Sequence, residues 1–198
     1  MGSHEDGSSA GLAAMRATTL CEAFQVTAAE RPPQVALRTL GGTLEITYAE
    51  FAAQVRTLAE GLHALGVRRG DTVALMLSNR PEFSLADVAA MHLGAIPFSI
   101  YNTSSAEQVA HVFRNAGNRV VVTERQFLAR VIEARTPEIE HIVLVDAAES
   151  GTRTMADLAA LRSAGFDFEG GWRDVQPDDV VTLIYTSGTT GPSKAAEL

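Results

Sequence analysis

Short apolar runs that alternate with helical segments constrain the fold of this chain more than any other feature of its sequence. The runs are rich in β-branched and aliphatic residues, as strands buried on both faces are. They predict strands at 72–77, 96–100, 120–122, 141–145 and 180–185. Capping residues and helical periodicity predict intervening helices at 79–93, 105–117, 124–135 and 154–164. The alternation therefore predicts an α/β, doubly wound, largely parallel sheet with helices on both faces. Pro97 suggests that its strand is an edge strand or irregular.

The N-terminal part of the chain precedes this alternation. Residues 1–17 are rich in Gly, Ser and Ala and are expected to form a flexible tail, which leaves 18–198 as one domain. A short helix is expected at 20–31, and Gly41-Gly42 predicts a hairpin between 35–38 and 44–47. The apolar stripe from Tyr48 to Leu65 predicts an amphipathic helix. Thr47 and Glu50 have the spacing of a capping box at its start.

Composition narrows the function classes. The net charge of −8 argues against binding to nucleic acid or to an anionic membrane surface. Cys21 is the single cysteine, so no internal disulfide can form, and we expect it to pack rather than react. No run approaches the roughly 20 apolar residues of a membrane span, and no secretory signal is visible. We expect a cytoplasmic protein and leave peripheral membrane attachment open.

The segment after the last predicted strand is the strongest indication of function. It contains Thr186, Ser187, Gly188, Thr189, Thr190, Gly191 and Lys194, and Lys194 is the only lysine in the chain. Glycines let consecutive N–H groups point at one anion, hydroxyls add donors, and the lysine adds a positive charge. The spacing is not that of the common P-loop, in which Gly-Lys is followed by Ser or Thr. The segment predicts a phosphate-binding loop at the carboxyl end of a strand.

The same segment resembles the phosphate-binding loop of the AMP-forming adenylating superfamily, which includes acyl-CoA synthetases, luciferases and peptide-synthetase adenylation domains. Leu-Ile-Tyr-Thr-Ser-Gly-Thr-Thr-Gly at 183–191 follows the family pattern throughout. Ser193 departs from a usual Pro, and Ala195 departs from a usual Gly. The second departure matters if that position needs a positive φ, because a Cβ is penalised there.

Two further segments resemble the same family. Asn-Arg-Pro-Glu-Phe at 79–83 is similar to a family stretch that follows an early strand, and 94–108 is similar to a segment of long-chain fatty acyl-CoA synthetases. In those enzymes a Tyr-x-Thr-Ser-Ser run leads into a helix, as Tyr101–Ser105 does here. The resemblance implies a fatty substrate. A capped helix start that contacts no ligand explains the run equally well, and both explanations can hold together.

The resemblance implies a fatty acid–CoA ligase with ATP, Mg²⁺ and coenzyme A as its cofactor and co-substrates. It implies that the seven residues named above, Thr186 to Gly191 together with Lys194, bind the ATP phosphates. Family members are much longer, and their adenine contacts, acidic metal-binding residue and second catalytic lysine lie beyond the part matched here. We therefore expect an N-terminal fragment, incomplete as a domain, without catalytic residues of its own and inactive alone. Its partners would be the missing C-terminal part or a second copy.

Other functions remain open at this stage. One alternative is a non-catalytic interaction module from a split or truncated synthetase, and another is an adenylating enzyme for a different carboxylic acid. A small nucleotide-binding protein with an unrelated reaction would need an adenine site that we do not find. Four histidines lack metal-like partners at helical spacing and are expected to be ordinary surface or boundary residues, namely His63, His92, His111 and His141.

Overall fold

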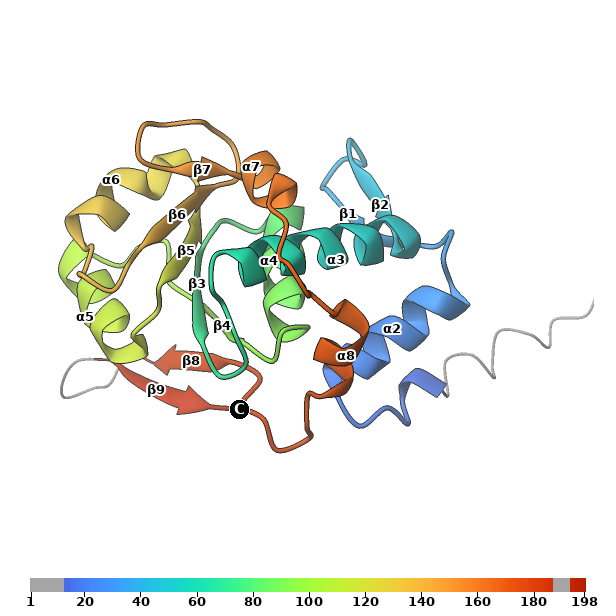
Figure 1. Ribbon diagram of the computed structural model, residues 1–198. Helices are drawn as coiled ribbons and strands as arrows, with labels where there is room; N and C mark the ends of the chain where they lie inside the picture. Colours follow the sequence, from blue (N-terminus) through green and yellow to red (C-terminus); the bar gives the residue numbers. More distant parts are fainter. Residues whose placement is uncertain (1–12, 187–192) are drawn as a thin grey trace, which may run out of the picture.

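A seven-stranded sheet forms the centre of the protein, in the order β7-β6-β5-β3-β4-β8-β9 (Figure 1). The computed structural model describes residues 13–186 and 193–198. All neighbouring strands from β7 to β8 are parallel, and β9 is antiparallel to β8. The strands are β3 Thr72–Met76, β4 Ile96–Ser99, β5 Val120–Thr123, β6 His141–Leu144, β7 Arg153–Thr154, β8 Leu183–Thr186 and β9 Lys194–Glu197. The predicted α/β, doubly wound fold class is confirmed.

Helices cover both faces of this sheet. A separate two-stranded hairpin lies beside one of these helices. The helices are α2 Leu20–Glu30, α3 Tyr48–Ala64, α4 Pro81–Met91, α5 Ala106–Ala116, α6 Arg125–Glu133, α7 Met155–Ala160 and α8 Phe168–Arg173. The hairpin pairs β1 Val35–Arg38 with β2 Glu45–Thr47 in antiparallel register, as Gly41-Gly42 predicted. Within the described residues, no helix is long and apolar enough to cross a membrane.

Strand β3 supplies side chains to two separate hydrophobic cores. Val73 and Leu75 belong to the core that contains residues of α3 and α4. Ala74 and Met76 belong to the core that contains residues of α5 and α6. All four side chains are fully buried, because successive residues of a strand point to opposite faces. Such a strand requires a helical layer on each side, which is the doubly wound arrangement.

The helix boundaries follow the capping signals in the sequence. Thr47 Oγ1 accepts from the Glu50 N–H while the Glu50 carboxylate accepts from the Thr47 N–H, so the predicted capping box starts α3. Ser105 and Gln108 form the same arrangement at the start of α5. Gly117 ends α5 in the left-handed conformation, with a φ of 65° that a side chain would disfavour.

Strand β4 lies inside the sheet, so of the two alternatives for Pro97 the edge strand was wrong, whereas an irregularity fits its pairing with β8. The Ile96 N–H donates to Asp71 O and the Ile100 N–H to Leu75 O, so the backbone N–H and C=O groups of even-numbered residues in and beside β4 point toward β3. Pro97 therefore faces β8, where its carbonyl accepts from Thr182 Oγ1 at 2.8 Å. Proline has no backbone N–H, so this donor is missing on the side of β4 that faces β8. The pairing there is the shortest in the sheet, because Phe98 with Leu183 is the one registered pair between the described residues of β4 and β8.

The region between β7 and β9 differs most from the sequence prediction. Helix α7 ends at Ala160, because Leu161 is extended with a ψ of 146°, and does not reach residue 164. Helix α8 was not predicted, since it contains Gly170 and Gly171; the Asp167 carboxylate accepts from the Gly170 N–H and starts it. Strand β8 begins at Leu183 rather than at residue 180, and β9 was not predicted at all.

His92 is a core residue, which corrects the expectation of a surface or boundary histidine. It is 1% exposed and its ring stacks on Phe168 at 5.4 Å. Val88 O lies 2.8 Å from Nδ1 and Gln25 Nε2 lies 3.0 Å from Nε2. A carbonyl only accepts, so Nδ1 carries the hydrogen and Nε2 accepts from Gln25. Burial lowers the pKa of His92 to about 4, and the ring joins α2, α4 and α8 as a neutral group.

Gly61 allows α3 and α7 to approach each other closely, and we predict that Gly61→Ala destabilises the protein. A Cβ at this position would lie 2.2 Å from the backbone oxygen of Leu158, which cannot move without shifting α7. We expect a loss of about 1–3 kcal/mol in the free energy of unfolding, measured by urea titration. Gly171→Ala is the matched control, because its Cβ would meet His92 O at an ordinary 3.5 Å. Equal stability of the two variants would contradict the prediction.

Candidate functional site

Thr186 and Lys194 lie opposite each other where the β8–β9 hairpin ends. Thr186 is the last residue of β8 and Lys194 the first of β9, and the two are directly paired in the antiparallel register. Both are exposed. Because β8 runs parallel to β4, Thr186 lies at the carboxyl edge of the sheet, where ligands bind in open α/β sheets. The other predicted binding residues, Ser187, Gly188, Thr189, Thr190 and Gly191, lie outside the described residues.

The two side chains share one face of the hairpin. Leu183 and Tyr185 of β8 are buried in the core beneath α5 and α6. Side chains alternate along a strand, so Thr186 points to the opposite face, and its direct partner Lys194 points there too. Opposed residues in an antiparallel pair have Cβ atoms about 5 Å apart. A hydroxyl-bearing and an amine-bearing side chain therefore start from neighbouring positions on an exposed surface, an arrangement that suits an oxyanion.

Lys194 lies in a strand, which corrects the prediction that the binding loop extends through it. Ala195 follows in the same strand, paired with Tyr185. Among the described residues, no residue other than glycine has a positive φ. Alanine in place of the family's usual glycine is therefore unstrained at position 195. The sequence did not reveal β9, because a run of Lys, Ala, Ala and Glu has no strand-like pattern.

Two polar side chains of α5 contact the hairpin. The Tyr185 hydroxyl donates to Asn115 Oδ1 at 2.8 Å, and His111 Nε2 donates to the carbonyl of Ser193 at 2.9 Å. His111 was expected to be an ordinary surface or boundary histidine, and sequence reasoning missed this contact. Its spacing of four residues from Asn115 was the available signal, because residues at i and i+4 share one face of a helix.

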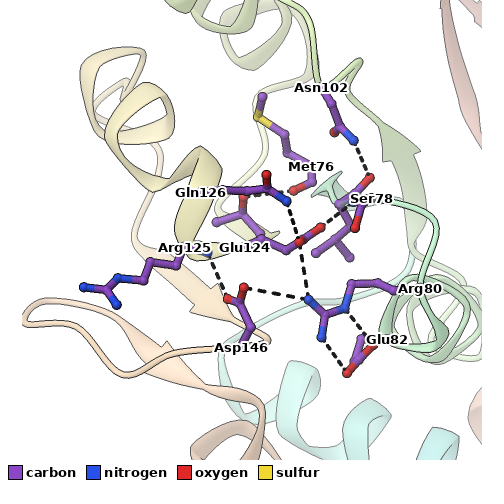
Figure 2. A network of polar contacts seen from close by, with 11 residues as sticks. Met76, Ser78, Arg80, Glu82, Asn102, Glu124, Arg125, Gln126 and Asp146 are labelled. Carbon is purple, nitrogen blue, oxygen red and sulfur yellow. Dashed lines mark hydrogen bonds and ion pairs between the residues drawn. The ribbon is translucent and has the colours of Figure 1, made fainter. Parts of the chain in front are cut away.

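A network of charged groups occupies the carboxyl ends of β3, β5 and β6 (Figure 2). At its centre, the Glu124 side chain is 5% exposed. Its carboxylate accepts from the Ser78 N–H and from Gln126 Nε2 at 2.8 Å, and it lies 3.4 Å from Arg80. Burial alone would raise the pKa of Glu124, but these hydrogen bonds and the charge of Arg80 outweigh it and lower the pKa. Glu124 is thus an ionised structural group at neutral pH.

Arg80 connects Glu124 with two more carboxylates. It donates twice to Glu82, at 2.8 and 2.9 Å, and lies 3.8 Å from Asp146. The hydrogen bond from Arg80 is the largest influence on the pKa of Glu82 and lowers it. Asp146 also accepts from the Arg125 N–H at 2.9 Å. Arg80 faces all three carboxylates, and the remaining bonds to them come from backbone and amide N–H groups, so the segment at 79–83 holds strand ends together.

The segment from Tyr101 to Ser105 forms the capped helix start that was one of its two explanations. Ser105 caps α5, and Asn102 Nδ2 donates to the carbonyl of Leu77 at 3.1 Å. Tyr101 is 63% exposed. Nothing in these contacts distinguishes a substrate-binding segment from a purely structural one, so the implied fatty substrate remains a proposal.

Comparison with known proteins identifies the relatives of this chain. The family model described as AMP-binding enzyme matches residues 24–198. The uncharacterized protein Rv1549 of Mycobacterium tuberculosis H37Rv is 57% identical over 133 residues, which cover 67% of this chain and 75% of that protein. 4-Coumarate–CoA ligase 3 of Oryza sativa is 36% identical over 152 residues, covering 77% of this chain and 26% of that enzyme.

Two further comparisons concern a fatty acid ligase and a solved structure. Long-chain-fatty-acid–CoA ligase FadD15 of Mycobacterium bovis is 34% identical over 173 residues, covering 78% of this chain and 26% of that enzyme. The crystal structure of the anthranilate CoA ligase AuaEII with anthranoyl-AMP superimposes with a TM-score of 0.78 at 24% identity. It covers 88% of this chain and 33% of that protein, and it supports the fold alone. The chain thus spans about a quarter of the named ligases that match its sequence.

Neutralising Glu124 tests whether the network is structural. Glu124→Gln keeps the shape and one acceptor but removes the charge that faces Arg80, so we expect unfolding to become easier by roughly 1–3 kcal/mol at pH 7. The folded-state pKa of Glu124 is lowered, so its contribution is present above the unfolded pKa and is lost as pH falls through the folded value. The difference between wild type and variant should therefore shrink on acidification, as measured by urea titration at several pH values. Glu107→Gln, on the exposed face of α5, is the control and should change the free energy of unfolding little. A stability difference between wild type and Glu124→Gln that does not vary with pH would contradict the structural role of Glu124.

Proposed function

The chain belongs to the AMP-binding enzyme family, and on this premise we propose that it is the phosphate-binding N-terminal part of a long-chain fatty acid–CoA ligase. The family and the α/β fold are firm, since the family model matches 24–198. The whole activity, the acyl substrate and the binding residues are proposals, because the chain spans about a quarter of the named ligases. We propose that it does not ligate acyl groups alone.

The proposed reaction has two steps. A fatty carboxylate attacks the α-phosphate of ATP, which releases pyrophosphate and gives an acyl-adenylate. The thiol of coenzyme A then attacks the acyl carbon, and AMP leaves. In the first step negative charge builds on the departing pyrophosphate. Donors and cations that are already in place where this charge develops lower the barrier.

The observation that carries the proposal is the direct pairing of Thr186 with Lys194 at the carboxyl edge of the sheet. It supports a site in which the Lys194 amine and the Thr186 hydroxyl contact the β- and γ-phosphates, which depart as pyrophosphate. We propose that Ser187, Gly188, Thr189, Thr190 and Gly191 supply backbone and hydroxyl donors to the same phosphates. The paired charges around Glu124 leave no comparable free cation at the neighbouring strand ends, within the part of the chain that the structure describes.

Mg²⁺ fits this site only as an ion that arrives with the nucleotide. Among the described residues, no group of three His, Cys, Asp or Glu side chains could hold a metal. Mg²⁺ keeps several waters and is often bound through substrate phosphates with one or two carboxylates. The bound ion would neutralise phosphate charge, while this chain would contribute Lys194 and the N–H donors. Coenzyme A contacts are assigned to no residue here.

The choice of a fatty acid rests on the segment at 94–108 and on the similarity to FadD15. The coumarate ligase relative favours an aromatic acid instead, and it shares slightly higher identity over a shorter stretch. An adenylating enzyme for another carboxylic acid is therefore the second candidate. A non-catalytic module is the third, and it is favoured by the match to most of the length of the uncharacterized mycobacterial protein. We propose a cytoplasmic location for each of these.

The single lysine provides a direct test of the phosphate site. An amine-acylating reagent can modify only Lys194 and the N-terminal amine, and mass spectrometry of peptides separates the two. We expect Mg-ATP to slow acylation of Lys194 several-fold while the N-terminal amine reacts as before. Lys194→Ala should weaken ATP binding by about tenfold or more, since a charge-assisted hydrogen bond is lost, whereas Lys194→Arg should retain part of it.

The same measurements can be repeated in a full-length relative that carries the remaining family domains. In that protein, turnover with fatty acid, ATP and coenzyme A can be followed. There Lys194→Ala, at the matching position, should raise the KM for ATP. Acylation of Lys194 unaffected by saturating ATP, together with unchanged ATP affinity in the alanine variant, would contradict the proposed phosphate site.

A further inference from the structure

The β8–β9 hairpin is joined to the rest of the sheet by very little backbone pairing. Four residue pairs are registered between β3 and β4, and four between β3 and β5. Between the described residues of β4 and β8, a single pair is registered, Phe98 with Leu183. Pro97 removes a donor on that side, and the hydroxyl of Thr182 replaces one backbone bond. Backbone hydrogen bonds alone therefore do not fix where the hairpin lies.

Side chains fix it instead. The Tyr185 ring packs on Phe98 with centroids 5.6 Å apart, and Tyr185 is 5% exposed. A buried hydroxyl needs a partner, and Asn115 Oδ1 supplies it at 2.8 Å. Directly before the other strand of the hairpin, the carbonyl of Ser193 accepts from His111 at 2.9 Å. One helix face thus holds both strands of the hairpin at their ends.

These two contacts lie directly beside the proposed binding residues. Tyr185 precedes Thr186, and Ser193 precedes Lys194. A side chain that fixes the peptide before Lys194 fixes where the Lys194 side chain leaves the backbone, and the same holds for Tyr185 and Thr186. The contacts come from the covered face of the hairpin, while Thr186 and Lys194 point to the exposed face. His111 and Asn115 can therefore orient the site from the side of α5.

We propose that His111 and Asn115 are positioning residues, which hold Thr186 and Lys194 in place at the carboxyl edge of β8. The role rests on the proposed function, in which those two residues bind phosphate. His111 acts through its Nε2 hydrogen and Asn115 through its carbonyl oxygen. A glutamine can replace the first group and an aspartate the second, whereas phenylalanine and leucine can replace neither.

Amide hydrogen exchange of the nucleotide-free chain is the deciding test. In His111→Phe and Asn115→Leu, we expect the amides of 183–186 and 194–197 to exchange about five to ten times faster, as the loss of one hydrogen bond predicts. The amides of β5 at Val120–Thr123 serve as an internal reference and should be unchanged. His111→Gln and Asn115→Asp should restore slow exchange, and Arg114→Gln, on the exposed side of α5, is the matched control.

A second measurement separates this role from general stability. Protection of Lys194 from acylation by inorganic tripolyphosphate should weaken in His111→Phe and recover in His111→Gln, while the melting temperature of both variants stays close to that of wild type. Hairpin exchange that is unchanged in the phenylalanine and leucine variants, or that accelerates equally in β5, would overturn the inference. If tripolyphosphate and ATP fail to protect Lys194 in the wild type, the result counts against the phosphate site, and the exchange result still decides whether His111 and Asn115 fix the hairpin.

Discussion

Burial of β3 on both faces is the constraint on which the rest of the structure depends. Its alternating side chains belong to two different cores, so neither helical layer can be absent without exposing apolar surface. Two helical layers require crossover connections, and crossovers make the strands parallel. Parallel strands in turn bring all their carboxyl ends to one edge. Both polar centres of the protein, the network around Glu124 and the hairpin end at Lys194, lie at this edge for that reason.

The two centres differ in how their charges are used. Around Glu124, arginine and carboxylate groups satisfy one another, and the hydrogen bonds from Ser78 and Gln126 complete the arrangement. Such a network stabilises one packing of the strand ends and leaves little capacity for a ligand. At the hairpin, Lys194 and Thr186 lie exposed on a face that the α5 contacts do not cover. The contrast is what favours the second centre as the place where an anionic substrate binds.

The sequence predicted the parts of the fold that are encoded locally. The capping boxes at Thr47 and Ser105, the Gly41-Gly42 turn and the buried β3 run each depend on neighbouring residues, and each was correct. Helix α8 and strand β9 were missed because tertiary contacts, not propensity, stabilise them. The burial of His92 depends on Gln25 and Phe168, which are remote in the sequence. For the site, sequence indicated Thr186 and Lys194; the spacing of His111 and Asn115 places them on one face of α5, but it does not say that this face contacts the same hairpin.

Pro97 has a mechanical consequence for the sheet. Strands β7, β6, β5, β3 and β4 are joined in this order by parallel ladders of registered pairs. Between β4 and β8, a single pair is registered within the described residues. Torsion of β8 and β9 about this line strains few backbone bonds, so resistance to it comes from side chains, above all Leu183 and Tyr185 in the core beneath α5 and α6. The position of the outer strand pair therefore depends on side-chain packing more than that of any strand inside the sheet.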